Sequence, residues 1–211
     1  MAERSRMTLY WSSRSPFVRK VMVMAHETGV VDLIDTKRVL VGSATLSAEV
    51  MAVNPLNKIP TLVLASGETI FDSLVICLYF DSLHDGARMA PPFGPQLMHD
   101  LTGHALGDGL MQNVVLRLAE RNRPADLQSP AHDAAYRAKI YATLDRLEAQ
   151  ADVWLGTRFS LASLAIGCAI AHLEFRYAAE NWRDGRPAVA HWFELFSKRP
   201  SVKATEYVEI Y

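Results

Sequence analysis

Hydrophobic and polar positions in the first third of the chain change their period several times, as they do in a domain that mixes strands with helices. Residues 7–11 alternate and are rich in β-forming side chains, which predicts a strand. From Pro16 the apolar positions recur at helical spacing, and Gly29 offers a stop. A second strand over 34–41 and a helix over 45–52 are predicted to follow.

The next segment predicts a hairpin and a helix. The stretch NPLNKIPTLVLASGETIFDS contains two short β-rich runs, and we expect a two-residue turn at Ser66 and Gly67 between them. A helix then opens at the pair Asp72 and Ser73. The predicted order is therefore βαβ followed by ββα, in a first domain that spans residues 1–84.

Beyond a segment rich in Gly and Pro at 85–96, the pattern is helical almost without interruption. We interpret that segment as a linker and 97–211 as an all-helical domain. A helix formed by residues 161–173 would be apolar on nearly every face, which predicts that it is buried on every side. At the start of this helix, Ser160 to Ser163 match a capping box without its acidic member, so we expect a weakened box.

The charge balance and the cysteine content limit the classes of partner expected for this chain. The chain of 211 residues has 22 basic and 23 acidic residues, and no long block of one sign. This balance gives no basic surface for nucleic acid or an acidic membrane, so small molecules or proteins are the expected partners. Cys77 and Cys168 lie far apart with no metal-ligand spacing, and 161–173 is too short to cross a bilayer. We expect a cytoplasmic protein with no metal.

Small hydroxyl residues crowd the predicted corner between the first strand and the first helix, in the stretch YWSSRSPFVRK. Proline is tolerated in the first turn of a helix, so Pro16 puts Ser12 to Ser15 at the corner. The first amides of a helix carry partial positive charge, so this corner favours an anion such as a thiolate, to which a serine hydroxyl can donate. The alternative is that these serines only cap the helix.

Two further short motifs carry candidate chemistry. In NKIPTL, a proline directly before a strand is a place for a cis bond that leaves the backbone of Ile59 unpaired and able to bind a peptide. In FDS, Asp72 and Ser73 open a helix, where they either cap it or hold a ligand.

Taken together and in this order, these motifs resemble the glutathione transferase family. The resemblance rests on YWSSRSPFVRKV, NPLNKIPTL and IFDSLVICLYF in the first domain, and on FSLASLAIGCAIAHLEFRY and WFELFSKRPSVKAT in the second. It implies an α/β domain of the thioredoxin-like type followed by an all-α bundle. It also implies a serine-type enzyme of detoxification that activates the thiol of glutathione for attack on a small, hydrophobic electrophile.

The resemblance assigns residues to parts of glutathione. The main chain of Ile59, beside a cis Pro60, would bind the cysteinyl backbone, and Asp72 with Ser73 would hold the γ-glutamyl end. Lys58 would pair with the glycyl carboxylate. The thiol would lie at the serine corner, where a hydroxyl and the helix amides lower its pKa.

Several assignments stay open. Ser12 is the first choice for the thiol donor and Ser13 the second, while Ser15 caps the helix. Arg14 is either a solvated corner residue or a cation that assists the thiolate or a carboxylated acceptor. Asn57 stands where many relatives have glycine, and asparagine tolerates the left-handed conformation better than other residues.

The acceptor pocket and the assembly follow from the same resemblance. Candidate lining residues of an acceptor pocket between the domains are Trp11, Met111, Val115 and Tyr177. We expect a homodimer, because this fold builds its site at a two-fold interface. The alternative function is a binding or regulatory protein that keeps the fold without catalysis.

Overall fold

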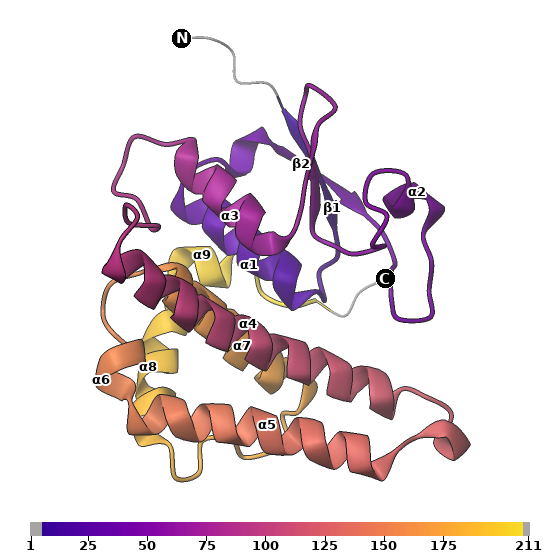
Figure 1. Cartoon of the computed structure of the whole chain (residues 1–211), viewed down its shortest axis with the longest axis vertical. Helices are drawn as coiled ribbons and strands as arrows, with labels where there is room; N and C mark the ends of the chain where they lie inside the picture. The colour runs from indigo at the N-terminus through magenta and orange to yellow at the C-terminus, as the bar shows by residue number, and fades with distance from the viewer. Residues whose placement is uncertain (1–5, 209–211) are drawn as a thin grey trace. The chain divides into compact units, whose positions relative to one another are not determined.

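A four-stranded mixed sheet organises the first part of the chain in the computed structural model, which describes residues 6–208 (Figure 1). Its strands are β1 (Met7–Trp11), β2 (Ile34–Arg38), β3 (Thr61–Val63) and β4 (Thr69–Ile70). Their order is β2-β1-β3-β4, with β1 parallel to β2 and antiparallel to β3, and with β4 antiparallel to β3. The predicted strands over 7–11 and near 34 are confirmed, although β2 ends at Arg38.

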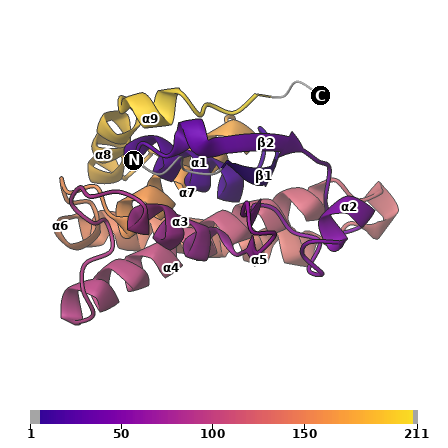
Figure 2. The ribbon, with the colours of Figure 1, turned by 90° about the horizontal axis from the view of Figure 1, so that it is seen from above.

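Two helices that pack against each other follow β1 and β4. They are α1 (Pro16–Glu27) and α3 (Ser73–Ser82). Helix α1 begins at its proline as predicted, and Val21 and Met24 on its predicted apolar face are fully buried. The helix predicted over 45–52 is only the single turn α2 (Ala48–Met51), which lies apart from α1 and α3 (Figure 2).

The hairpin between β3 and β4 has a different loop from the predicted two-residue turn. The amide of Leu64 donates to the carbonyl of Glu68, so three residues lie between this pair. The amide of Gly67 donates back to the carbonyl of Leu64, and Gly67 has φ 87°. A turn followed by a left-handed glycine is the common three-residue solution, and the glycine therefore belongs to the end of the loop.

The second part of the chain is helical. Its elements are α4 (Pro95–Arg121), a 3₁₀ turn η2 (Ala125–Leu127), α5 (Pro130–Ala149), α6 (Ala151–Trp154), α7 (Leu161–Arg176) and α8 (Pro187–Ser197). Every residue of α7 from Leu161 to Leu173 is buried, as the apolar run predicts. Helix α4 approaches α7 closely at Gly107, where an added Cβ would stand 2.5 Å from the backbone nitrogen of Ile166.

The cap of α7 corrects one expectation. The sequence predicts a weakened capping box because residue 163 is not acidic. In the structure, the amide of Ser163 donates to Ser160 Oγ at 3.3 Å, and the amide of Ser160 donates to Ser163 Oγ at 2.8 Å. Both halves of the box are therefore present, because a hydroxyl oxygen accepts the bond that a carboxylate would accept.

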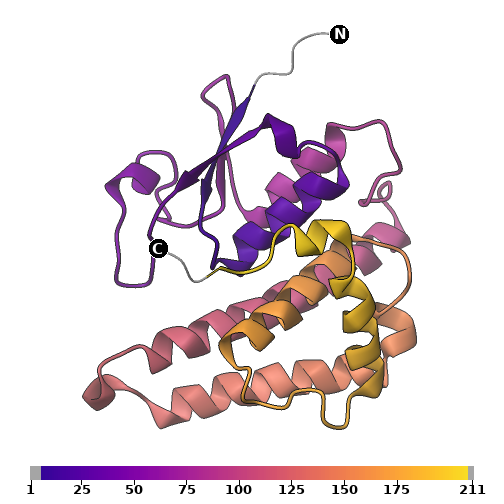
Figure 3. The same ribbon diagram turned by 180° about the vertical axis from the view of Figure 1, so that it is seen from behind.

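The chain divides into two compact units, and the division differs from the sequence-based domains at the C-terminal end. One unit contains the described residues up to Arg88 together with those from Pro200 onward, and the other is Met89–Arg199. Helix α9 (Pro200–Lys203) packs against α1, as Figure 3 shows. The assignment of the last residues to the helical domain is thus corrected, because tertiary contacts with α1 hold them.

No helix among the described residues is both long enough and apolar enough to cross a bilayer.

Candidate functional site

The register of the sheet brings the three predicted motifs to one edge. Tyr10 pairs with Thr61, so the end of β1 lies beside the start of β3. Leu62 pairs with Ile70, so the end of β4 returns to the start of β3. The segments after β1, before β3 and after β4 therefore share one edge of the sheet.

The predicted binding residues of the first unit lie along this edge. Ser12 follows β1, Pro60 precedes β3, and Asp72 follows β4. Neighbouring strands lie about 4.8 Å apart, so the step from Ser12 across β3 to Asp72 is on the order of 10 Å. Helices α1 and α3 also begin at this edge, and the partial positive charge at both helix starts favours anionic groups there.

The three serines of the corner have different hydrogen bonds. Ser15 caps α1 as predicted, since its Oγ accepts from the amide of Val18 at 3.3 Å. Ser13 Oγ donates to the carbonyl of Val208 at 2.8 Å. Ser12 Oγ accepts from the amide of Arg14 at 3.4 Å, and its hydroxyl proton has no acceptor among the described residues. Ser12 and Ser15 thus each keep a hydroxyl proton without an acceptor among the described residues, whereas Ser13 does not.

The loop before β3 has the geometry expected from its proline. The peptide between Ile59 and Pro60 is cis. Among the described residues, neither the N–H nor the C=O of Ile59 forms a hydrogen bond, and its side chain is half-buried. Lys58 is exposed. The predicted main-chain groups are available to a ligand in this part of the chain.

Asn54 supports this loop and was missed by the sequence analysis. It is buried, and its Nδ2 donates to Thr61 Oγ1 at 2.9 Å and to the carbonyl of Lys58 at 3.3 Å. Thr61 Oγ1 in turn donates to the same carbonyl at 2.9 Å. The signal was an asparagine directly before the Pro of NPLNKIP. Asn57 has φ 52°, so it adopts the left-handed conformation that the sequence analysis allowed.

Asp72 and Ser73 begin α3. Asp72 Oδ1 accepts from the amides of Leu74 at 3.0 Å and Val75 at 3.4 Å, so the carboxylate caps the helix. The side chain is nevertheless exposed, whereas Ser73 is buried. A capping carboxylate uses one oxygen here and leaves the other for a cation.

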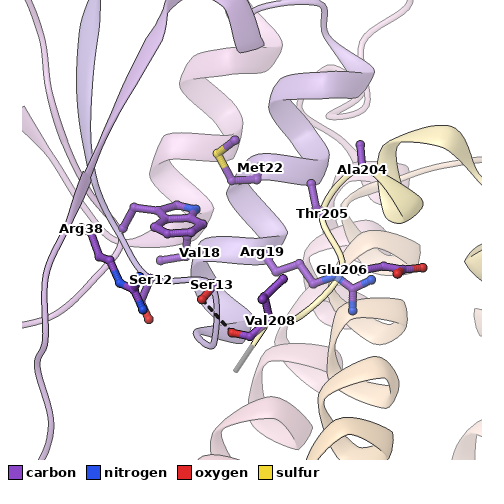
Figure 4. Close-up of a pocket in the computed structure, with 11 residues that line it drawn as sticks. Ser12, Ser13, Val18, Arg19, Met22, Arg38, Ala204, Thr205, Glu206 and Val208 are labelled. Carbon is purple, nitrogen blue, oxygen red and sulfur yellow. Dashed lines mark hydrogen bonds between the residues drawn. The ribbon is translucent and has the colours of Figure 1, made fainter. Parts of the chain in front are cut away.

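A cavity of about 320 Å³ adjoins the serine corner (Figure 4). Its walls come from the end of β1 with the two residues after it, from α1, from Arg38 at the end of β2, and from residues 204–206 and 208. Trp11, one of the predicted acceptor residues, lines it. The other three predicted acceptor residues belong to the second unit, where Met111 and Tyr177 are buried and Val115 is half-buried.

An ion-pair cluster in the second unit was not predicted. Arg117 is 1% exposed and contacts both oxygens of Glu180, at 2.9 and 2.8 Å, and Asp133 at 3.1 Å. Arg121 donates to Asp133 at 2.7 Å, and the guanidinium carbons of Arg117 and Arg121 lie 4.5 and 5.2 Å from the ring centre of Tyr177. The cluster joins α4, α5 and the loop after α7. The sequence signal was the spacing of the two arginines by one helical turn.

The cluster sets the pKa values of its acids. Hydrogen bonds from Arg121, and then Arg117, hold the pKa of Asp133 below its usual value against the effect of burial. Burial tends to raise the pKa of Glu180, but the hydrogen bond and charge of Arg117 outweigh it and lower that pKa. Burial raises the pKa of Tyr177 despite both arginines. The two carboxylates are thus charged at neutral pH.

Among the described residues, no group of three or more His, Cys, Asp or Glu side chains is arranged to hold a metal ion.

Comparisons with known proteins agree with the resemblance in the sequence. Residues 14–83 match the model of the glutathione S-transferase N-terminal domain, and residues 123–195 match that of the C-terminal domain. An uncharacterized GST-like protein, YibF of Escherichia coli (strain K12), is 33% identical over 95% of this chain and 98% of its own length.

Two solved structures of a glutathione transferase family member from Pseudomonas fluorescens Pf-5 are also similar. One, with bound glutathione, is 35% identical, covers 96% of this chain and 99% of its own, and has a TM-score of 0.93. The other, with bound S-(propanoic acid)-glutathione, is 34% identical, covers 96% and 100%, and has a TM-score of 0.88.

Proposed function

We propose that this chain, which belongs to the glutathione S-transferase family, binds glutathione and activates its thiol for attack on a small electrophile. The observation that carries the proposal is the shared edge of the sheet. There, three motifs that would bind three different parts of glutathione lie beside the starts of two helices. We further propose that the enzyme acts in detoxification in the cytoplasm, where its buried, free cysteines would stay reduced.

The order of the motifs along the edge suits the parts of glutathione. The step of roughly 10 Å from Ser12 to Asp72 would separate the thiol from the γ-glutamyl end. The cysteinyl backbone would pair with the unpaired main chain of Ile59, as an added strand does. The γ-glutamyl ammonium would meet the exposed carboxylate of Asp72, and its carboxylate the start of α3 at Ser73. Lys58 would reach the glycyl carboxylate.

The thiol would then lie at the serine corner. Ser12 has a hydroxyl proton with no acceptor among the described residues, and the first amides of α1 lie beside it. Both interactions favour a thiolate over a thiol, so they lower the pKa of the bound sulfur. Ser13 is the weaker candidate because its proton already goes to the carbonyl of Val208. Arg14 would add positive charge to the same corner.

The alternative function is a glutathione-binding protein without catalysis. A glutathione transferase family member from Pseudomonas fluorescens Pf-5 has been solved with glutathione and with S-(propanoic acid)-glutathione, and we take the S-substituted ligand as support for conjugation by this chain. Retention on immobilised glutathione followed by a conjugation assay with an aryl halide distinguishes the two functions. We expect retention and turnover; retention without turnover on any acceptor would support the alternative, and no retention would contradict both.

Two substitutions of Asp72 separate its role in glutathione binding from its role in the stability of the fold. Because its carboxylate caps α3, Asp72→Ala should raise the KM for glutathione and also lower the free energy of unfolding by about 0.5–2 kcal/mol. Asp72→Asn keeps an oxygen for the cap but removes the charge, so it should raise KM several-fold with near-native stability. In both variants kcat at saturating glutathione should change little, because this contact is remote from the sulfur. An unchanged KM in Asp72→Asn would contradict the assigned contact.

We also propose that the chain forms a homodimer. In this family the site is expected at a two-fold interface, and an isologous contact would cover apolar surface that a single chain exposes. Sedimentation velocity at micromolar concentration should give a species of twice the chain mass, and a monomer alone would overturn this proposal.

A further inference from the structure

One buried arginine of the first unit lacks an acidic partner among the described residues. Arg19 on α1 is 8% exposed, and its Nη2 donates to the carbonyl of Val202 at 3.1 Å. Its guanidinium carbon lies 4.5 Å from the ring centre of Tyr207. Its Nε is buried and has no hydrogen-bond partner in the described part of the chain.

No carboxylate among the described residues therefore compensates the positive charge of Arg19. A buried charge is expensive unless it is paired, and removal of one partner from a buried pair is strongly destabilising. Arg117 in the second unit shows the compensated case, with two carboxylates around it. Arg19 forms no ion pair with any described residue, including Glu206, which lines the same cavity. An anion at Arg19 would supply the missing charge.

Arg19 lines the cavity next to the serine corner, so the anion has a place to bind. Figure 4 shows Arg19 beside Val208 and Glu206, with Arg38 near Ser12. The ring of Trp11 and the side chains of Val18 and Met22 give the same cavity an apolar wall. A volume of about 320 Å³ matches the lower range of small-molecule sites. The cavity therefore combines an apolar wall with a buried cation.

The strand order relates this cavity to the proposed glutathione site. Ser12 follows β1, which lies between β2 on one side and β3 on the other. Ile59 and Asp72, the proposed peptide ligands, lie on the side of β3 and β4, whereas Arg38 of the cavity ends β2. A sulfur at Ser12 would thus stand between the peptide part of glutathione and the cavity.

We propose that this cavity is the acceptor subsite, and that it selects electrophiles with a flat apolar body and a carboxylate, which Arg19 binds. This inference rests on the proposed function. With an aryl halide as acceptor, the thiolate sulfur bonds to the ring carbon that carries the halogen, and the halide leaves with the electron pair of the broken bond. Arginine suits this role because its planar group holds a carboxylate through paired N–H bonds while an aromatic ring stacks on its face.

A matched pair of acceptors tests the selection. 4-Chloro-3-nitrobenzoate and 4-chloro-3-nitrobenzamide differ in one substituent, an anionic carboxylate in the first and a neutral amide in the second. Each kcat/KM is divided by the uncatalysed rate constant with glutathione. We expect the wild type to prefer the benzoate by about 10- to 100-fold, the value of one hydrogen-bonded charge contact. Arg19→Gln should abolish the preference, and Arg19→Lys should keep part of it.

Controls separate charge recognition from support of the C-terminal segment. Lys203→Gln removes one positive charge from α9 at an exposed position outside the cavity, and it should keep the full preference. If Arg19 only holds residues 202–207 in place, Arg19→Gln would lower both rates equally and leave the preference intact, which would overturn the proposal.

A binding measurement without glutathione keeps this inference separate from the proposed function. Calorimetric titration with the unreactive 3-nitrobenzoate and 3-nitrobenzamide should give tighter binding of the benzoate to the wild type and equal binding of both to Arg19→Gln. Equal affinities for the wild type would overturn the anionic subsite even if conjugation occurs. Preferential binding with no turnover would uphold the subsite and contradict only the enzymatic function.

Discussion

Ser12→Ala is expected to raise the pKa of the bound glutathione thiol by about one to two units. The hydroxyl bond is made to the charged sulfur, and the loss of a hydrogen bond to a charged group costs about 1.5–3 kcal/mol. Conjugation at pH 7 should slow by about 3- to 25-fold as the thiolate fraction falls, for a bound thiol whose pKa starts roughly two units below 8.5. Glutathione affinity should change little, because Ile59 and Asp72 hold the peptide. The measurement is the thiolate absorbance near 240 nm, a property of the ligand, against pH.

The other serines of the corner are the controls. Ser13→Ala removes a bond to the carbonyl of Val208 and should leave the thiol pKa unchanged. Ser15→Ala removes the cap of α1 and should lower the free energy of unfolding by about 1 kcal/mol. A shift of the titration only in Ser13→Ala would show that Ser13 is the donor. No shift in either Ser12→Ala or Ser13→Ala would assign thiol activation to the amides of α1 or to Arg14.

Arg117→Met should have the largest effect on stability, a loss of about 3 kcal/mol in the free energy of unfolding. Removing one partner of a buried ion pair lowers the free energy of unfolding by about 3–5 kcal/mol, because the remaining charge stays buried without its partner. The lower end applies because Asp133 keeps Arg121 and both carboxylates are partly exposed. Urea unfolding measures the loss. Arg123→Met, at an exposed pair with Glu120, should cost under about 1 kcal/mol.

The loss of stability in Arg117→Met should depend on pH, and its direction follows from the pKa values of the two carboxylates. The pKa values of Asp133 and Glu180 are lowered in the folded chain, so their contribution is present above the unfolded values and is lost as pH falls through the folded ones. The ordinary values are 3.8 and 4.5. The stability difference between wild type and Arg117→Met should therefore shrink as pH falls below about 4. A difference that is constant down to acid pH would contradict the role of these carboxylates.

Local sequence signals predicted the elements that carry the candidate site. Pro16 after a run of serines marked the start of α1, and Asp72 marked the start of α3, because capping depends on a few adjacent residues. The proline of NKIPTL marked the cis bond, because cis peptide bonds occur almost only before proline. The resemblance implied that these motifs bind one ligand, and the strand register of the structure brings them to one edge.

Features that depend on contacts between distant residues could not be predicted in this way. Nothing near Pro200 in the sequence indicates that the residues after it pack on α1. The sequence analysis assigned no role to Arg19, because its burial depends on Val202 and Tyr207, far along the chain. The cluster around Arg117 joins three elements. Each of these features is set by tertiary packing rather than by local propensity.

Proton release on glutathione binding tests the central claim most directly. A free thiol with a pKa near 8.5 is almost fully protonated at pH 7, so binding as a thiolate must release a proton. Calorimetric titrations of the wild type, in buffers of different ionisation enthalpy, should give saturable binding and release of more than about half a proton per glutathione for a pKa lowered by roughly two units. S-methylglutathione, which has no thiol proton, should bind with no release. Equal proton release for both ligands, or no saturable binding of glutathione, would contradict the account.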